Sequence, residues 1–227
     1  MFVLLSHVID PKDRAYPGEP VVSIEQDSQI GKDGKPFNSA MIRLPNHFAT
    51  HMDAPHHFNP DGIDMVDLPE SIYGYRGEEI FVLDLPDKGE GAVITEQDIA
   101  PYAQQLQGKR LLLLRTGFEK HKFTDPDLYE NRGPSLHPSF CRWLIEHTDK
   151  LVCIGMDWLS IASPANDFGA EAHRWLLGNY QDRYIVGIED MSLAPLGDKD
   201  IEVLTLGPLR VRGVDSAQVS VMALLAD

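Results

Sequence analysis

The chain has 227 residues, of which 43% are hydrophobic and 24% charged, so it is long enough to bury a sizeable core. Lys and Arg number 20 against 35 Asp and Glu, and the net charge of −15 argues against nucleic-acid partners and anionic membrane surfaces. No apolar run approaches the ~20 residues that span a bilayer, and the opening MFVLLSHVIDPKD has no basic segment before its apolar stretch, so we expect a cytoplasmic protein.

Short apolar, β-branched runs bounded by Gly, Pro and Asp predict strands at residues 2–8, 39–45, 79–85, 110–115, 151–156, 184–189 and 217–225. Helices are predicted at 95–107, 137–147 and 169–177. Thr95 suits the first N-cap, Pro138 suits a first turn, and Gly108 and Gly178 follow the last helical residues of the first and third helices. More strands than helices, in mixed order, favour an α/β or α+β fold with a barrel-like or layered sheet. Without a repeat or a clear linker, 1–227 is expected to form one domain.

Four of the nine histidines fall between positions 47 and 57, in NHFATHMDAPHHFNPDG. Histidine and aspartate are common ligands of zinc-like cations. His47, His51 and Asp53 are separated by even numbers, so an extended strand would present all three on one face, whereas a helix would align only the histidines. Pro55 also argues against a continuing helix. The spacing therefore predicts a ligand-bearing strand over 47–53, in preference to a solvated His-rich edge or a set of core histidines.

Ala49 would lie on the same strand face, between His47 and His51. A large side chain there would fill the space of the metal, so we expect position 49 to require a small residue. Beyond Pro55 the chain can bend, which would turn His57 toward the ligand face and His56 away from it. Because imidazole titrates near neutral pH, His57 is the candidate proton-transfer residue.

Three ligands from one segment leave a metal site incomplete, so distant residues must contribute. His173, in GAEAHRWLLG, is one candidate, and a packed helix histidine is the alternative. Glu189 ends the apolar run YIVGIE, where a carboxylate is costly unless it is paired or metal-bound; an ion pair with Arg or Lys is the alternative. Asp157, after LVCIGM, is a similar strand-end carboxylate that we place behind Glu189.

The segment HFATHMDAPHH resembles the H-x-G-T-H-x-D-x-P-x-H signature of the cyclase family, which includes bacterial kynurenine formamidases and isatin hydrolases. The similarity extends over nearly the whole chain: LSH and Tyr16-Pro17-Gly18 near the start, PFNSAMIRL before the signature, and LLLLRTG, IGMD, AHRWLLG and GIEDMSL after it occur in the family's order. The chain differs at Ala49, where the signature has Gly, and at Tyr16, where the formamidases carry Trp.

The resemblance implies a role for each candidate residue. The metal ligands would be His47, His51, Asp53, His173 and Glu189. Asp53 would be able to bridge two ions, His57 would be the catalytic acid/base, and Tyr16 would contact the substrate. The resemblance also implies one or two divalent ions (zinc first, manganese as the alternative), a small-molecule substrate, and a homodimer or homotetramer. The implied fold is a compact one of the swivelling β/β/α type, with a partly barrel-like mixed sheet and few helices.

The predicted activity is hydrolysis of an amide or lactam bond in a small molecule, as in an arylformamidase-like amidohydrolase that acts on C–N bonds other than peptide bonds. A metal would lower the pKa of water to ~7, and His57 would carry the proton to the leaving nitrogen. An alternative keeps the metal but closes, dehydrates or isomerises the substrate through an enolate. A structural metal site is a third hypothesis, but such zinc sites are usually Cys-rich, and neither Cys141 nor Cys153 lies near a candidate ligand in the sequence.

Overall fold

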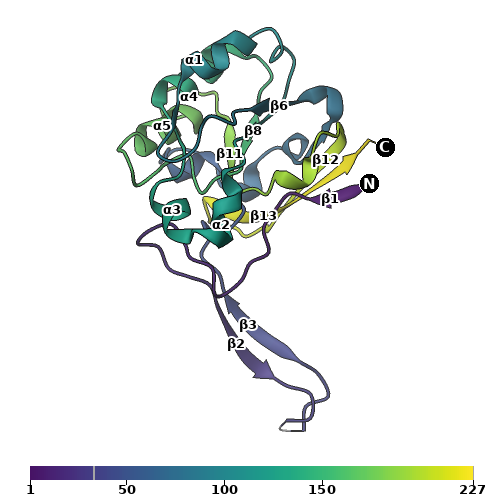
Figure 1. The fold of residues 1–227 in the computed structure, drawn as a ribbon. Helices are drawn as coiled ribbons and strands as arrows, with labels where there is room; N and C mark the ends of the chain where they lie inside the picture. The colour runs from purple at the N-terminus through teal and green to yellow at the C-terminus, as the bar shows by residue number, and fades with distance from the viewer. Residues whose placement is uncertain (33, 227) are drawn as a thin grey trace.

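The computed structural model describes residues 1–32 and 34–226, and in this part of the chain the main feature is a nine-stranded sheet. Its strand order is β5-β12-β13-β4-β11-β10-β8-β6, and β1 pairs with β13. The sheet curves into a barrel-like form with a few helices on one side (Figure 1). The predicted α/β fold with a partly barrel-like mixed sheet is therefore confirmed.

One half of the sheet is parallel and the other half is antiparallel. The parallel strands are β6 (Ile80–Asp84), β8 (Leu111–Arg115), β10 (Cys153–Met156) and β11 (Val186–Glu189). The antiparallel strands are β1 (Phe2–Leu4), β4 (His51–Asp53), β5 (Gly74–Arg76), β12 (Ile201–Pro208) and β13 (Ser216–Leu225). The short strand β4 joins the two halves, because it pairs with β11 on one side and with β13 on the other.

The two faces of the sheet bury two apolar cores. Parallel strands covered on both faces read as continuous apolar runs, and residues 111–114 of β8 are all fully buried leucines. Their outer side packs with the helices α1 (Glu96–Ile99), α4 (Pro138–His147) and α5 (Gly169–Leu176). Their inner side meets β4, β12 and β13 in the second core. The two shorter helices, α2 (His121–Thr124) and α3 (Pro126–Asn131), follow β8.

All seven predicted strands are present, although most are shorter than expected: the strand predicted at 2–8 covers only Phe2–Leu4. Two of the predicted helices match α4 and α5 to within one residue at each end. The helix predicted at 95–107 is wrong beyond Ile99, because Pro101 lacks the amide proton that a continuing helix needs, and a 3₁₀ turn over Ala100–Tyr102 follows. The elements that we did not predict are β2, β5, β7 (Val93–Ile94), β9 (Ser135–Leu136), β12, α2 and α3.

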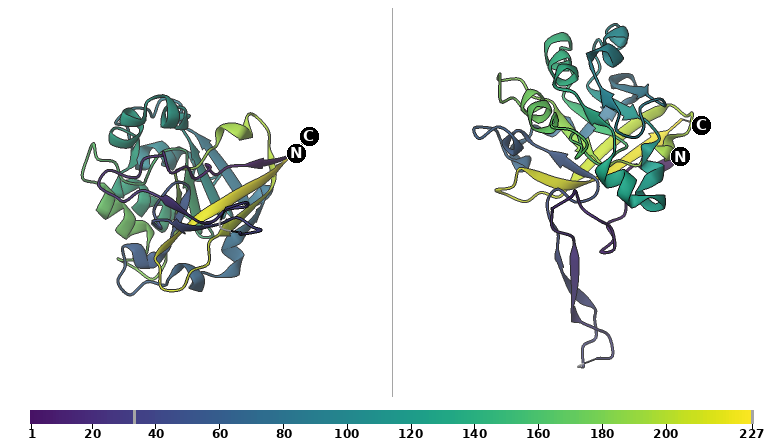
Figure 2. Two further views of the ribbon diagram at one scale, coloured as in Figure 1. Left: turned by 90° about the horizontal axis from the view of Figure 1, so that it is seen from below. Right: turned by 60° about the vertical axis from the view of Figure 1, so that its left-hand side comes forward.

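A two-stranded hairpin projects from the body of the protein. Strands β2 (Ser23–Ser28) and β3 (Ser39–Arg43) pair only with each other and extend well beyond the barrel (Figures 1 and 2). The longest helix among the described residues, α4, has ten residues, and none of the described helices is long and apolar enough to cross a membrane.

Candidate metal centre

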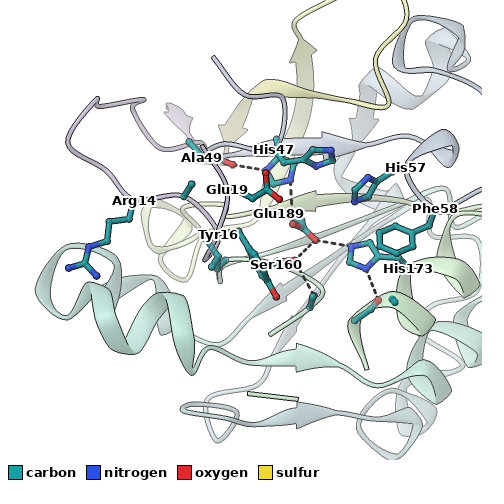
Figure 3. Close-up of a pocket in the computed structure, with 16 residues that line it drawn as sticks. Arg14, Tyr16, Glu19, His47, Ala49, His57, Phe58, Ser160, His173 and Glu189 are labelled. Carbon is teal, nitrogen blue, oxygen red and sulfur yellow. Dashed lines mark hydrogen bonds and ion pairs between the residues drawn. The ribbon is translucent and has the colours of Figure 1, made fainter. Parts of the chain in front are cut away.

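A cavity of about 340 Å³ opens where β4 and β11 lie side by side. Its walls come from four parts of the chain: residues 14–19 before the hairpin, the His-rich segment 47–58, residues 159–173 leading into and along α5, and Glu189 at the end of β11. Figure 3 shows His57, Phe58 and His173 together on one side, with Tyr16 toward the other and Glu189 between them. The structure thus brings four of the five candidate ligands (His47, His51, His173 and Glu189), His57 and Tyr16 to one pocket, and Asp53 lies fully buried directly behind them.

Strand pairing places the first ligands. His51 lies opposite Glu189 across the β4–β11 ladder, and Asp53 lies opposite Gly187, which has no side chain to compete for space. Because side chains alternate along a strand, His51 and Asp53 share one face of β4 and Met52, fully buried, points into the core. This part of the predicted ligand strand matches the structure.

The predicted strand is wrong for His47. The chain turns at Ala49, whose φ of 55° lies in the left-handed region, and β4 begins only at His51. The turn carries His47 back over the site, where its Nδ1 lies 3.3 Å from an Asp53 carboxylate oxygen. The predicted placement of Ala49 between His47 and His51 on a strand face is therefore wrong, and the left-handed backbone at position 49 favours glycine, the residue of the family signature.

Asp53 occupies the centre of the cluster. Its carboxylate oxygens lie 3.3 Å from His47 Nδ1, 3.6 Å from His51 Nε2 and 3.8 Å from His173 Nε2. Both oxygens are buried, and neither has a hydrogen-bond partner among residues 1–32 and 34–226. A buried carboxylate without a donor is costly, whereas a divalent cation held between it and the surrounding imidazoles would satisfy it.

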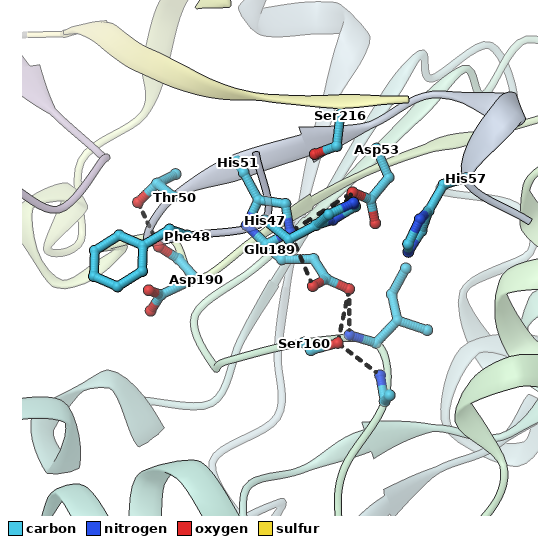
Figure 4. Close-up of polar contacts among 12 residues, drawn as sticks. His47, Phe48, Thr50, His51, Asp53, His57, Ser160, Glu189, Asp190 and Ser216 are labelled. Carbon is cyan, nitrogen blue, oxygen red and sulfur yellow. Dashed lines mark hydrogen bonds and ion pairs between the residues drawn. The ribbon is translucent and has the colours of Figure 1, made fainter. Parts of the chain in front are cut away.

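The donor set fits one or two such ions. His47, His51 and Asp53 offer ligand atoms within 4.8 Å of one another, and so do Asp53, His57 and His173. The two groups share Asp53, the residue expected to bridge two ions. Imidazole nitrogens with carboxylate oxygens suit zinc and similar transition metals. Figure 4 shows His47, His51, Asp53 and His57 converging from β4 and the segments on either side of it.

Backbone carbonyls fix which nitrogen each histidine presents. His51 donates from Nδ1 to the Ala49 carbonyl at 2.7 Å, and His173 donates from Nδ1 to the Gly169 carbonyl at 2.6 Å, one turn earlier in α5. In both rings Nε2 is left to face the centre. Such outer hydrogen bonds orient metal-binding histidines. His173 therefore lies in the candidate site, and the alternative of a histidine that only packs within its helix does not describe its surroundings.

Glu189 lies under these two imidazoles. Its carboxylate oxygens are 3.3 Å from His51 Nε2 and 3.4 Å from His173 Nε2, and one of them accepts bonds from Ser160 Oγ and the Ile161 amide at 3.0 and 2.7 Å. Burial would raise the pKa of Glu189, but His173 and His51 hold it well below its usual range. The alternative of an ion pair with Arg or Lys does not describe its surroundings.

Asp190, the next residue, anchors the end of β11 through a buried ion pair. Its carboxylate accepts from Lys122 Nζ at 2.6 Å and from the Tyr129 hydroxyl at 2.5 Å, and its carbonyl accepts from Thr50 Oγ1 at 2.5 Å. Asp190 has a φ of 55°, in the left-handed region, so these contacts hold a strained residue directly beside Glu189.

Sequence reasoning missed Asp215. One of its carboxylate oxygens accepts from His57 Nδ1 at 2.8 Å and from His47 Nε2 at 3.1 Å. The other accepts from the side-chain Nδ2 of Asn46 at 2.7 Å. The bonds from His47 and His57 lower the pKa of Asp215, and Asp215 and Asp53 together, against the opposing effect of burial, raise the pKa of His47 to about 10. The only sequence signal was an aspartate two residues before the strand predicted at 217–225. It lies more than 150 residues from the histidines that it contacts.

Two predicted details have clear structural outcomes. His56 points away from the centre, as expected, and lies 2.6 Å from Asp64. Asp157 does not reach the site, because its carboxylate accepts from the Thr116 hydroxyl and from the Thr116 and Gly117 amides in the turn after β8. Asp157 therefore organises a loop.

The sequence pattern of the cyclase family matches residues 3–163. The chain belongs to the cyclase family. This cyclase-family protein is 28% identical to a kynurenine formamidase of Bacillus cereus over 204 residues, which cover 90% of this chain and 88% of that protein. An uncharacterized protein of Haemophilus influenzae is 35% identical over 132 residues, or 56% of this chain and 91% of that protein.

Solved structures share the fold of this chain. Isatin hydrolase A from Labrenzia aggregata matches with a TM-score of 0.81 at 21% identity, over 100% of this chain and 94% of that one. A structure described as a potential metal-dependent hydrolase with cyclase activity matches with a TM-score of 0.71 at 19% identity, over 98% and 96% of the two chains. The family signature therefore lies on the fold expected for it.

Proposed function

We propose that this cyclase-family protein is a metal-dependent hydrolase that cleaves an amide or lactam C–N bond in a small molecule. The observation that carries the proposal is the buried Asp53 carboxylate, which has no hydrogen-bond donor and faces the histidines of the pocket. The name of the Bacillus cereus relative, a kynurenine formamidase, and the names of the structural neighbours agree with this chemistry.

The chain's own residues would hold one or two divalent ions. The first ligand group is His47, His51 and Asp53. The second group is Asp53, His57 and His173, so the two groups share Asp53. Glu189 lies beside the imidazoles of His51 and His173. When bound, the ion supplies hydroxide at neutral pH and polarises the substrate carbonyl. Zinc suits this donor set, and manganese is the alternative.

His57 is placed to move the proton. Because its Nδ1 donates to Asp215 at 2.8 Å, its Nε2 is the nitrogen left to face Asp53 and His173. Nε2 can take a proton from the attacking water and return it to the leaving nitrogen, so the Nδ1–Asp215 bond persists through both steps. Asp215 also stabilises the imidazolium that forms between them, as a buried carboxylate does beside a catalytic histidine.

The pocket suits a small, partly aromatic substrate. Tyr16, Phe58 and Leu159 supply half-buried apolar walls, and Arg14 and Glu19 lie among the polar groups of its lining. A volume of about 340 Å³ lies at the lower end of ordinary ligand pockets. N-formyl aromatic amides and bicyclic lactams such as isatin have this character. Tyr16 replaces the Trp of the formamidases, so we expect its hydroxyl to influence which of them is preferred.

The test is hydrolysis of N-formylkynurenine, isatin and simple formamides by protein stripped with chelator and reloaded with Zn²⁺ or Mn²⁺. Metal-restored turnover with uptake of one water per product supports the proposal. Turnover of enolisable substrates without water uptake would support the enolate alternative instead. Irreversible unfolding by the chelator would indicate a structural metal. The His56→Ala variant is the matched control for His57→Ala, because it removes the neighbouring histidine that points away from the centre.

A further inference from the structure

A buried threonine joins the two segments that carry candidate ligands on neighbouring strands. Thr50 lies directly before His51 in the signature segment, is 3% exposed and does not line the pocket. We propose that Thr50 is a positioning residue of the candidate metal centre, whose hydroxyl holds the start of β4 against the end of β11 and so sets the placement of His51 relative to Glu189. This role rests on the proposed function, because it concerns the ligands of that metal site.

The backbone pairing between β4 and β11 stops at the ligand pair. Its last pairing joins His51 to Glu189, and a further step of the antiparallel register would pair Thr50 with Asp190. Asp190 has a φ of 55°, however, and Ala49, the residue before Thr50, has the same φ. These two are the only non-glycine residues with a positive φ among residues 1–32 and 34–226. Because an extended strand cannot continue through a left-handed residue, the backbone ladder does not secure the two chains beyond the ligand pair.

The Thr50 hydroxyl supplies the connection that the backbone does not. Its Oγ1 donates to the Asp190 carbonyl at 2.5 Å, as Figure 4 shows, and accepts from the His7 amide at 2.9 Å. A hydroxyl has a single proton to donate, so the bond to Asp190 uses all of its donor capacity. On the other side, the Thr50 carbonyl accepts from the Val219 amide of β13 at 3.1 Å. Thr50 is therefore fixed to both neighbouring chains, to one through its main chain and to the other through its side chain.

The opening segment LSH, residues 5–7, completes the connection through its backbone. Its last amide donates to the Thr50 hydroxyl, and its first carbonyl accepts from the Ser192 amide at 3.0 Å. Between them, Ser6 forms a single antiparallel bridge with Met191. The segment therefore contacts both the signature turn and the chain that follows β11. Because the segment itself contributes only main-chain groups, the Thr50 hydroxyl is the side-chain group on which the three parts of the chain converge.

The spacing of the ligand pair depends on this connection. His51 Nε2 lies 3.3 Å from a Glu189 carboxylate oxygen, and both residues project from the strand ends that Thr50 joins. Without the hydroxyl, the Asp190 carbonyl would lose its donor, and the strand ends would separate to let water reach it. The two ligands would then be less well placed for a cation. Groups outside the ligand set typically change metal affinity by ~10- to 100-fold, and we expect a loss of ~10-fold because Thr50 acts through the backbone.

The variants Thr50→Val and Thr148→Val form a matched pair, because valine keeps the shape of threonine and removes its hydroxyl. Thr148 is also buried; its hydroxyl donates to the Leu144 carbonyl at 2.7 Å and accepts from Arg183 at 2.8 Å, at the end of α4. The Kd for Zn²⁺, measured by competition with a chromophoric chelator, should rise ~10-fold in Thr50→Val and stay at the wild-type value in Thr148→Val. Thr50→Ser keeps the hydroxyl and should retain wild-type affinity. Thr50→Ala is the second variant should Thr50→Val not fold, and it should also raise the Kd.

Amide hydrogen exchange of the metal-free protein measures the connection itself. Exchange should be faster in Thr50→Val than in the wild type over residues 47–54 and 186–192, and Thr148→Val should leave it unchanged there. This measurement needs neither metal nor substrate, so it separates a failure of the positioning role from a failure of the proposed hydrolase. A wild-type Kd in Thr50→Val, an equal loss of affinity in Thr148→Val, or unchanged exchange over both segments would overturn the proposal.

Discussion

Replacing Asp215 by Asn tests whether this carboxylate orients His57 for proton transfer. The change keeps the side chain's shape but removes the charge that accepts from His57 Nδ1 at 2.8 Å and from His47 Nε2 at 3.1 Å. A hydrogen bond to a charged group contributes about 1.5–3 kcal/mol, and each 1.36 kcal/mol of barrier is tenfold in rate. Losing the charge-assisted bond to His57 should therefore lower kcat by ~10- to ~100-fold.

The assay is steady-state hydrolysis of the best N-formyl or lactam substrate at saturating metal, with bound metal measured in the same samples. Asp215→Asn should retain its metal and have a KM close to that of the wild type, because the substitution slows only the proton-transfer step. Asp61→Asn, an exposed carboxylate outside the pocket lining, is the control and should leave kcat unchanged. Wild-type kcat in Asp215→Asn would refute the positioning role, and loss of metal would show that Asp215 serves binding instead.

Further predictions follow from the same contacts. His57→Ala should lower turnover by at least ~10²-fold, and elemental analysis should show that it retains its metal. A near-normal rate would contradict the proton-transfer role of His57. Ala49→Gly should raise the free energy of unfolding, measured in urea, by about 1 kcal/mol, because it relieves a left-handed alanine. Ala49→Leu should lose metal. An unchanged free energy of unfolding in the first variant, or unchanged metal content in the second, would contradict the left-handed turn at Ala49. Lys122→Met should lower the free energy of unfolding by about 3–5 kcal/mol, because it leaves the Asp190 charge buried without its lysine partner. Burial opposes the Asp190 charge, but Lys122, His7 and Tyr129 together lower the pKa of Asp190, so this stabilisation is present above pH ~4 and is lost as pH falls further. The stability gap between wild type and Lys122→Met should therefore narrow in acid, and a constant gap would count against the ion pair.

Much of the fold and part of the site could be predicted from local patterns. Continuous apolar runs identified the buried parallel strands, and the even spacing of His51 and Asp53 correctly placed these two candidate ligands on one face of β4. His173 and Glu189 were candidates because a polar residue in an apolar segment needs a partner. Strand β12 was missed, although its sequence IEVLTLGP alternates from buried to exposed at several positions.

The remaining features depend on contacts that no local pattern encodes. The even spacing suggested that His47 lies on the strand, but the left-handed turn at Ala49 places it over Asp53 by a different path. Asp215 meets His57 only because β13 pairs with β4, a contact between distant parts of the chain. The helix was predicted to run to Gln107 because Thr95 suits its start and Gly108 its end, but Pro101 ends it after Ile99. Long-range strand pairing and one left-handed backbone angle thus determine the positions of Asp215 and His47, which the spacing of residues in the sequence could not predict.

The central claim is that the Asp53 carboxylate and the imidazoles around it bind a divalent cation. The most direct test is the metal content of purified, dialysed protein, measured by plasma mass spectrometry for the wild type and for Asp53→Asn, with His56→Asn as the histidine control. The account predicts one or two equivalents of zinc or manganese in the wild type and in His56→Asn, and less than a tenth of that in Asp53→Asn. A folded wild type that holds no metal after incubation with Zn²⁺ and Mn²⁺, or an Asp53→Asn variant that binds as well as wild type, would contradict it.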